Sequence, residues 1–175
     1  MHRAYLLIGS NQGNRILFLK KATQLLKSKA GKLIKKSSIY ETAAWGKEGL
    51  PAHLNQALLI QTSLSAIELL KEIHQIEKKL GRQRQEKWGC RTIDIDIIYY
   101  DDAIIQTESL TIPHPLLQER RFVLKPLQEI APNFQHPILQ KTNQELLNIT
   151  QDSLPVQRII QGEVCSLRMI FRHLK

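Results

Sequence analysis

The chain has 175 residues, 42% of them hydrophobic, which is enough for one compact domain and too short to make two comfortable ones. Its formal net charge of +9 favours a polyanionic partner, and nucleotide phosphates would serve as well as nucleic acid. The two cysteines form no C-x-x-C pair, and the apolar run at residues 4–8 is too short for a signal peptide or a membrane span. We therefore expect a soluble, cytoplasmic protein without a disulfide framework or a zinc site.

The first part of the chain predicts a strand, a helix and two further strands. Residues 5–8 are a short apolar strand, and the GSNQGN stretch after them has the composition of a turn. Asn14 is a good N-cap for a helix whose apolar residues recur at helical spacing until Gly31. Residues 33–42 and 54–64 alternate as two strands, with AAWGKEGLPAH as the break between them.

A second helix and a last strand complete this pattern. Ser65 and Glu68 form a capping-box pattern, and the amphipathic helix that follows ends at Gly81. The polar stretch RQRQEKWGCR then leads to a strand over residues 92–100. The order β-α-β-β-α-β predicts the α+β class and a ferredoxin-like sandwich, in which two helices pack on one face of an antiparallel sheet. The other face is expected to be free.

The pattern weakens after Asp102. The stretch IPHPLLQERRF is loop-like, and residues 123–130 predict a short helix. The remaining residues show no clean period, so no element is predicted there.

Two aspartates alternate with isoleucines in the last predicted strand. Successive side chains of a strand point to opposite faces, so Asp94 and Asp96 project together while Ile93, Ile95 and Ile97 pack into the core. Carboxylates on Cα atoms about 7 Å apart suit a hard ion such as Mg²⁺, whose remaining ligands are water and substrate phosphates. The alternative is a solvated pair on an exposed sheet face.

Basic residues bracket this carboxylate pair in the sequence. Arginine binds phosphate oxygens bidentately and histidine adds a further donor, so the pattern indicates a metal–polyphosphate site. The chain has no P-loop motif that could hold the phosphates instead. The bracketing residues are Arg82, Arg84, Arg91, His114, Arg120 and Arg121.

The sequence resembles the 6-hydroxymethyl-7,8-dihydropterin pyrophosphokinases, a family of folate-synthesis enzymes. RTIDIDI at residues 91–97 carries the resemblance, with GRQR and WG before it, IPHP and RRFVLKPL after it, and YLLIGSNQGNR near the N-terminus. The resemblance implies a Mg²⁺-dependent diphosphotransferase that moves the pyrophosphoryl group of ATP to the hydroxymethyl group of the reduced pterin and releases AMP. It places a pyrophosphokinase domain at residues 1–150, and residues 151–175 are an extension of unknown role in the same domain.

The resemblance also implies roles for individual positions. Asp94 and Asp96 would hold two Mg²⁺ ions, and Arg82 and Arg91 would act beside them in catalysis. Nucleotide contacts would come from His74, Glu77, Arg82, Arg91, Ile97, His114 and Arg120. Pterin contacts would come from Thr42, Ala43, Trp45, His53, Asn55, Trp88 and Phe122, a set whose aromatic faces and amide suit a flat heterocycle with a polar edge.

The chain departs from the family pattern at several positions. Ala43 and Ala44 stand where two prolines are usual, which predicts a pterin loop that is less rigid before binding. His53 replaces a common Tyr or Phe, His74 an expected glutamine, and Cys90 a usual proline. The stretches AAWGKEGLPAH and RQRQEKWGC are expected to be lids that exclude water from the reaction.

Two other functions fit parts of the sequence. An RNA-recognition domain is also a basic ferredoxin-like sheet, but its aromatic signature is missing and Asp94 with Asp96 would repel phosphates. A degenerate, regulatory relative of the enzyme would explain Ala43, Ala44 and His53. We expect a monomeric enzyme whose partners are ATP and a reduced pterin, with no nucleic acid and no membrane.

Overall fold

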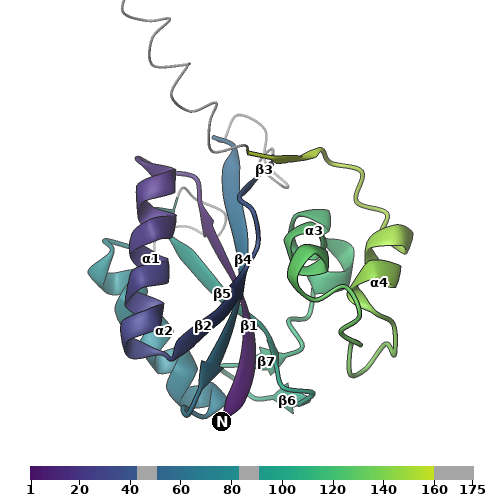
Figure 1. The fold of residues 1–175 in the computed structure, drawn as a ribbon, viewed down its shortest axis with the longest axis horizontal. Helices are drawn as coiled ribbons and strands as arrows, with labels where there is room; N and C mark the ends of the chain where they lie inside the picture. Colours follow the sequence, from purple (N-terminus) through teal and green to yellow (C-terminus); the bar gives the residue numbers. More distant parts are fainter. Residues whose placement is uncertain (43–50, 83–90, 160–175) are drawn as a thin grey trace, which may run out of the picture.

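An antiparallel sheet runs through the molecule and carries helices on both of its faces (Figure 1). The computed structural model describes residues 1–42, 51–82 and 91–159. The strand order is β5-β1-β4-β3-β8, and β2 pairs with β4 beside this path. Its strands are β1 (His2–Ser10), β2 (Lys32–Lys36), β3 (Tyr40–Thr42), β4 (His53–Thr62), β5 (Asp94–Tyr100) and β8 (Val156–Arg158).

The other elements within the described residues are helices and one small hairpin. The α-helices are α1 (Arg15–Lys29), α2 (Ala66–Lys79), α3 (Arg121–Ile130) and α4 (Asn143–Ile149). A 3₁₀ turn, η1 (Leu117–Glu119), precedes α3, and β6 (Ile105–Gln106) pairs with β7 (Thr111–Ile112). None of these helices is long and apolar enough to cross a membrane.

Helices α1 and α2 begin and end where the sequence predicts. The Asn14 side chain accepts a hydrogen bond from the Leu17 amide, and Ser65 and Glu68 form the predicted capping box. Gly31, with a φ of 147°, follows α1 at a point where a Cβ atom would collide with the Gln61 carbonyl. Local capping and glycine chemistry therefore set these helix ends.

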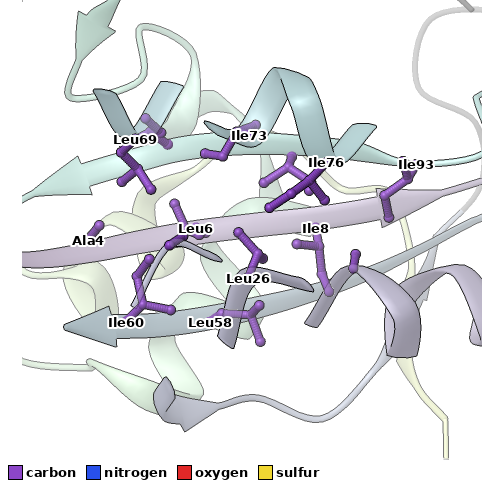
Figure 2. Packing of buried hydrophobic residues seen from close by; sticks show 14 of the residues in the cluster. Ala4, Leu6, Ile8, Leu26, Leu58, Ile60, Leu69, Ile73, Ile76 and Ile93 are labelled. Atoms are coloured by element: carbon purple, nitrogen blue, oxygen red, sulfur yellow. The ribbon is translucent and has the colours of Figure 1, made fainter. Parts of the chain in front are cut away.

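The core between these two helices and the sheet holds most of the buried aliphatic side chains. Figure 2 shows Leu6 and Ile8 of β1 beside Leu58 and Ile60 of β4, with Ile73 of α2 packed against them. Ile93, Ile95 and Ile97 belong to the same cluster. The alternation predicted for β5 is thus present, with its isoleucines in this core.

The strand predicted at residues 33–42 is interrupted. Residues of β2 pair with the end of β4, whereas Tyr40–Thr42 pair with its beginning. At the break, the Ser37 amide donates to the Ala57 carbonyl, and the Ser37 hydroxyl accepts from the Ala57 amide. Because Ser37 bonds to β4 through its side chain as well as its backbone, the ladder changes register there and two short strands result.

The prediction that the second face of the sheet is free is wrong. Helices α3 and α4 cover part of it, and Leu124 and Leu127 of α3 lie in one buried cluster with Tyr5, Leu7 and Tyr99 of the sheet (Figure 1). The helix predicted at residues 123–130 is present and begins two residues earlier, while α4 was not predicted. Asp94, Gly9 and Asn55 lie at the end of this face, beyond Leu7 and Ala57 of that cluster.

Candidate active site

Asp94 and Asp96 project from β5 on the face that α3 and α4 partly cover. Both side chains are half-buried, while Ile95 between them is buried in the core on the other face. Asp96 lies opposite Leu7, whose side chain belongs to the cluster beneath α3. The two carboxylates therefore share one face of the edge strand, as the alternation predicts.

A glycine separates this pair from the polar residues of the neighbouring strands. Gly9 of β1 lies opposite Asp94 on one side and Asn55 of β4 on the other. A Cβ atom at Gly9 would lie 2.9 Å from Asn55 Oδ1, so only glycine leaves this position open. Asp94 and Asn55 are two strands apart, which is about 10 Å, with no side chain between them in this row.

Asp94 is bound by two arginines. Its Oδ1 atom lies 2.8 Å from Arg82 Nη1, and its Oδ2 atom pairs with Arg91 Nη1. Arg82 also pairs with Glu77, whose Oε1 atom accepts a hydrogen bond of 2.8 Å from the Ile95 amide. Glu77 thus accepts a hydrogen bond from the backbone of the edge strand β5 and, through its ion pair with Arg82, keeps Arg82 beside Asp94.

Burial is the main influence on the pKa values of Glu77 and Asp96. It raises the pKa of Glu77, an effect that the Arg82 guanidinium opposes. Burial, reinforced by the neighbouring Asp94 and Glu77 carboxylates, raises the pKa of Asp96 to about 7. A cation placed beside Asp96 would relieve this unfavourable burial of charge.

His114 and Arg120 face the carboxylate pair from the segment before α3. Burial and the Arg120 charge lower the pKa of His114 to about 4, although Asp94 acts in the opposite sense. Burial also lowers the pKa of Arg120, while the Asp96 carboxylate raises it. The neutral His114 ring accepts a hydrogen bond of 3.3 Å at Nδ1 from the Leu116 amide, which assigns its proton to Nε2 and makes that atom a donor.

The residues predicted for the pterin meet at the end of β3, the start of β4 and the start of α3. Asn55 Nδ2 donates to Thr42 Oγ1 over 3.1 Å, and both side chains are buried. His53 lies opposite Thr42, and burial lowers its pKa while the nearby Asp94 raises it. Phe122 lies beside Arg120, whose Cζ atom is 5.7 Å from the centre of the ring.

Some predicted site residues are placed differently or lie outside the described residues. Ile97 is 4% exposed in the core beneath α1 and α2, so a nucleotide contact there would have to come from its main chain. His74 is exposed on α2, one turn before Glu77. The residues outside the described ranges are Ala43, Ala44, Trp45, Arg84, Trp88 and Cys90, together with most of both expected lids.

Two polar residues that the sequence analysis did not assign to the site support it from β1 and α1. Asn11, 1% exposed, accepts a hydrogen bond of 2.7 Å at Oδ1 from the Arg91 amide, and its backbone amide donates to the Arg91 carbonyl over 3.2 Å. Arg15 donates to Glu41 Oε1 over 2.8 Å and to the Ala52 carbonyl over 2.7 Å. The available signal was the GSNQGN turn, which places polar groups where β1 ends.

The arrangement defines a class of protein. A half-buried carboxylate pair, surrounded by guanidinium groups and a neutral histidine at one end of an α+β sandwich, suits a polyphosphate accompanied by a hard cation. On the other side of Gly9, Asn55 and Thr42 form a second, uncharged part of the site that could contact another ligand.

The comparison with family models makes the assignment specific. The model of the 7,8-dihydro-6-hydroxymethylpterin-pyrophosphokinase (HPPK) family matches residues 5–132, and the chain belongs to this family. The match spans β1 to just beyond α3, and therefore includes every site residue named above.

Relatives and solved structures agree with this assignment. The 2-amino-4-hydroxy-6-hydroxymethyldihydropteridine pyrophosphokinase of Aquifex aeolicus is 45% identical over 145 residues, which cover 83% of this chain and 90% of that protein. The enzyme of the same name from Bacillus subtilis is 41% identical over 162 residues, or 91% and 97% of the two chains. Wild-type Plasmodium falciparum HPPK-DHPS has a similar fold, with a TM-score of 0.68 at 18% identity over 84% of this chain and 44% of that one.

Proposed function

We propose that the cluster around Asp94 and Asp96 is the site at which this chain carries out pyrophosphoryl transfer. The enzyme transfers the pyrophosphoryl group of ATP to the hydroxymethyl group of 6-hydroxymethyl-7,8-dihydropterin in folate synthesis. The observation that carries the location is the binding of Asp94 by Arg82 and Arg91, across Gly9 from Asn55. This geometry supports a site with a polyphosphate side around Asp94 and a heterocycle side around Asn55.

The polyphosphate side consists of the arginines and His114. In the transfer, the hydroxymethyl oxygen of the pterin loses its proton to water and forms a bond to the β-phosphorus of ATP, and the bond from that phosphorus to the oxygen of the departing AMP breaks. Negative charge grows on the bridging and leaving oxygens, where Arg82, Arg91 and Arg120 would stabilise it. His114, neutral near pH 7 because its pKa is about 4, would donate from Nε2 to a phosphate oxygen.

The carboxylate pair fits Mg²⁺ that arrives with the nucleotide. The described residues contain no group of three or more His, Cys, Asp and Glu side chains suited to a metal, and Mg²⁺ commonly uses only one or two carboxylates beside substrate phosphates. Asp94 and Asp96 would hold the ions. When bound, Mg²⁺ would neutralise charge on the transferred phosphates. Arg82 and Arg91 would then turn from Asp94 to the phosphates.

The heterocycle side consists of Thr42, Asn55, His53 and Phe122. The Asn55 amide can both donate and accept along the polar edge of a pterin, and the flat rings of His53 and Phe122 can cover its faces. Ala43, Trp45 and Trp88 remain predicted pterin contacts, as Ile97, His74 and Glu77 remain predicted nucleotide contacts.

The proposal extends to the fold type and to the setting of the enzyme. A ferredoxin-like sandwich is supported by the order β1-α1-β2/β3-β4-α2-β5, with β2 and β3 counted as one interrupted strand. The pairing of β8 with β3 supports one domain that includes residues 151–159. We further propose a cytoplasmic monomer whose reaction requires only small-molecule partners.

Mixing the purified chain with ATP, Mg²⁺ and the reduced pterin tests the function. The expected result is AMP and the pterin pyrophosphate in equal amounts, with no AMP when the pterin is omitted. Chromatography separates AMP from ADP and so distinguishes pyrophosphoryl from simple phosphoryl transfer. A chain that binds both ligands without forming AMP would instead be the regulatory relative, and RNA binding without AMP formation would point to the RNA-binding alternative.

A further inference from the structure

The segment after α4 reaches the part of the site that carries Arg120 and Phe122. The Asp152 carboxylate accepts two backbone hydrogen bonds, from Leu154 over 3.0 Å within its own turn and from Arg121 over 2.9 Å across 31 positions of the chain. From there the segment continues to β8, drawn in yellow near β3 in Figure 1. Its far end is bonded as well, because the Ile159 amide donates to the Ile39 carbonyl over 2.8 Å.

Helix α3 needs an acceptor at its first amide. Arg120 stands at its N-cap without a side-chain capping bond, and the first turn contains no acidic residue. Two arginines at the positive end of a helix dipole are unfavourable, and a carboxylate there is stabilising. Asp152 therefore supplies from a distant segment both the hydrogen-bond acceptor and the negative charge that this helix start lacks.

The peptide that Asp152 holds lies between two site residues. Arg120, on one side of Arg121, is the cation whose charge acts on both Asp96 and His114. Phe122, on the other side, has its ring 5.7 Å from the Arg120 Cζ atom. The Arg120 carbonyl also accepts from the Val123 and Leu124 amides, so the orientation of this residue depends on how α3 begins.

From these contacts we propose, on the basis of the function proposed above, that Asp152 is a positioning residue of the active site. Through the Arg121 amide it sets where α3 begins, and thereby places Arg120 against the phosphates and Phe122 against the pterin. This assigns a role to the C-terminal extension, for which the sequence suggested none.

Two substitutions test this role against a matched control. Asp152→Ala removes the acceptor, whereas Asp152→Asn keeps an acceptor oxygen and removes the charge. Glu145→Ala is the control, because Glu145 accepts hydrogen bonds from the Thr142 amide and hydroxyl at the start of α4, away from the site residues. Each protein is assayed for its KM for both substrates, its kcat and its thermal midpoint.

Asp152→Ala is expected to raise the KM for ATP and for the pterin by about tenfold, an amount in line with the loss of a helix cap. Asp152→Asn should recover most of this loss. Glu145→Ala should lower the thermal midpoint and leave both KM values unchanged. Wild-type KM values for Asp152→Ala, or equal increases for Glu145→Ala, would overturn the proposal.

Two further measurements separate this inference from the proposed function. NMR signals of the Phe122 ring and hydrogen exchange of the Arg121 amide report the start of α3 whether or not AMP is formed. Both should change in Asp152→Ala and remain near wild type in Asp152→Asn, and no change in Asp152→Ala would refute the role of Asp152. In an Arg120→Ala background, Asp152→Ala should raise the KM for ATP little further, whereas a full additive increase would also refute it.

Discussion

The two aspartates of β5 have different surroundings although they share one face. Asp94 is balanced by Arg82 and Arg91. Asp96 lies deeper, and burial with its acidic neighbours raises its pKa to about 7. The charge of Asp96 is therefore a cost to the free protein, and a bound cation would compensate it.

Asp96→Ala and Asp94→Ala are each expected to abolish turnover, because one remaining carboxylate cannot hold the metal and phosphates together. Asp96→Ala should nevertheless unfold at the same or a higher temperature than wild type, since it removes an unfavourable buried charge. Asp102→Ala, at the exposed turn after β5, is the control and should retain full rate. A rate above about one tenth of wild type for Asp96→Ala, a barrier change under ~1.4 kcal/mol, would refute the metal assignment.

Asn11 offers a second test, because its side-chain Oδ1 atom accepts the hydrogen bond from the Arg91 amide. Asn11→Ala should lower kcat by about tenfold, since a misplaced guanidinium stabilises the transition state less. The same substitution in an Arg91→Ala background should cause little further loss. Ser10→Ala is the matched control, because the buried Ser10 hydroxyl has no hydrogen-bond partner among the described residues. Independent, additive losses would show that Asn11 does not act through Arg91.

Glu129 connects α3 to the segment between β2 and β3. Its carboxylate accepts hydrogen bonds from the Ser38 amide and hydroxyl and from the Tyr40 hydroxyl, the last over 2.8 Å. Burial and this contact with Glu129 raise the pKa of Tyr40 to about 12. Because Tyr40 begins the strand that ends at Thr42, the tie aligns α3 with the pterin side of the site.

Glu129→Ala should lower the free energy of unfolding by about 1 kcal/mol, less than the ~1.5–3 kcal/mol of hydrogen bonds to charged groups, because Glu129 is exposed. Burial would raise the pKa of Glu129, but the bonds from Tyr40 and Ser38 outweigh it and lower the pKa below 4.5. The stabilisation is therefore complete above pH 4.5 and is lost as the pH falls through the folded-state value. Urea unfolding at several pH values should show the difference from wild type shrinking in acid, and a difference that grows there would contradict this assignment.

One sheet contributes side chains to two hydrophobic cores, one on each of its faces. Leu6 of β1 packs beneath α1 and α2, whereas the adjacent Leu7 packs beneath α3 and α4. Because adjacent residues of one strand belong to the two cores, the loss of either core removes packing from the sheet that both cores share. The described part of the chain should therefore unfold as a single cooperative unit.

Leu6→Ala and Leu127→Ala, each fully buried in a different core, should each cost about 2–5 kcal/mol. Both should move the same unfolding transition, recorded by circular dichroism and by tyrosine fluorescence in urea. Leu17→Ala, whose side chain is 43% exposed on α1, should have an effect below about 1 kcal/mol. Two separate transitions, only one of them shifted by Leu127→Ala, would show that the α3–α4 layer folds independently.

Helix caps depend on residues close together in the chain, so they can be predicted from the sequence. One such cap, at the start of α4, was not predicted although its residues are present in the sequence. The caps at Asn14 and Ser65 are local patterns and lie where the sequence predicts them. The capping box of Thr142 and Glu145 at α4 is equally local, but α4 is only seven residues long and gives little periodicity. The break at Ser37 could not be foreseen, because it depends on bonds to Ala57 in another strand.

The sequence was sufficient to predict α1, α2, α3, β1, β4 and β5 and the shared face of Asp94 and Asp96, because caps, glycines and the two-residue period of a strand act over a few positions. Three features became visible in the folded structure alone: α3 and α4 cover the second face, Asn11 bonds Arg91, and Asp152 bonds Arg121. These contacts join residues far apart in the chain. In the sequence, many residues could accept a hydrogen bond from a given amide or cover a given apolar helix face. The folded sheet selects one of them by bringing it within bonding distance.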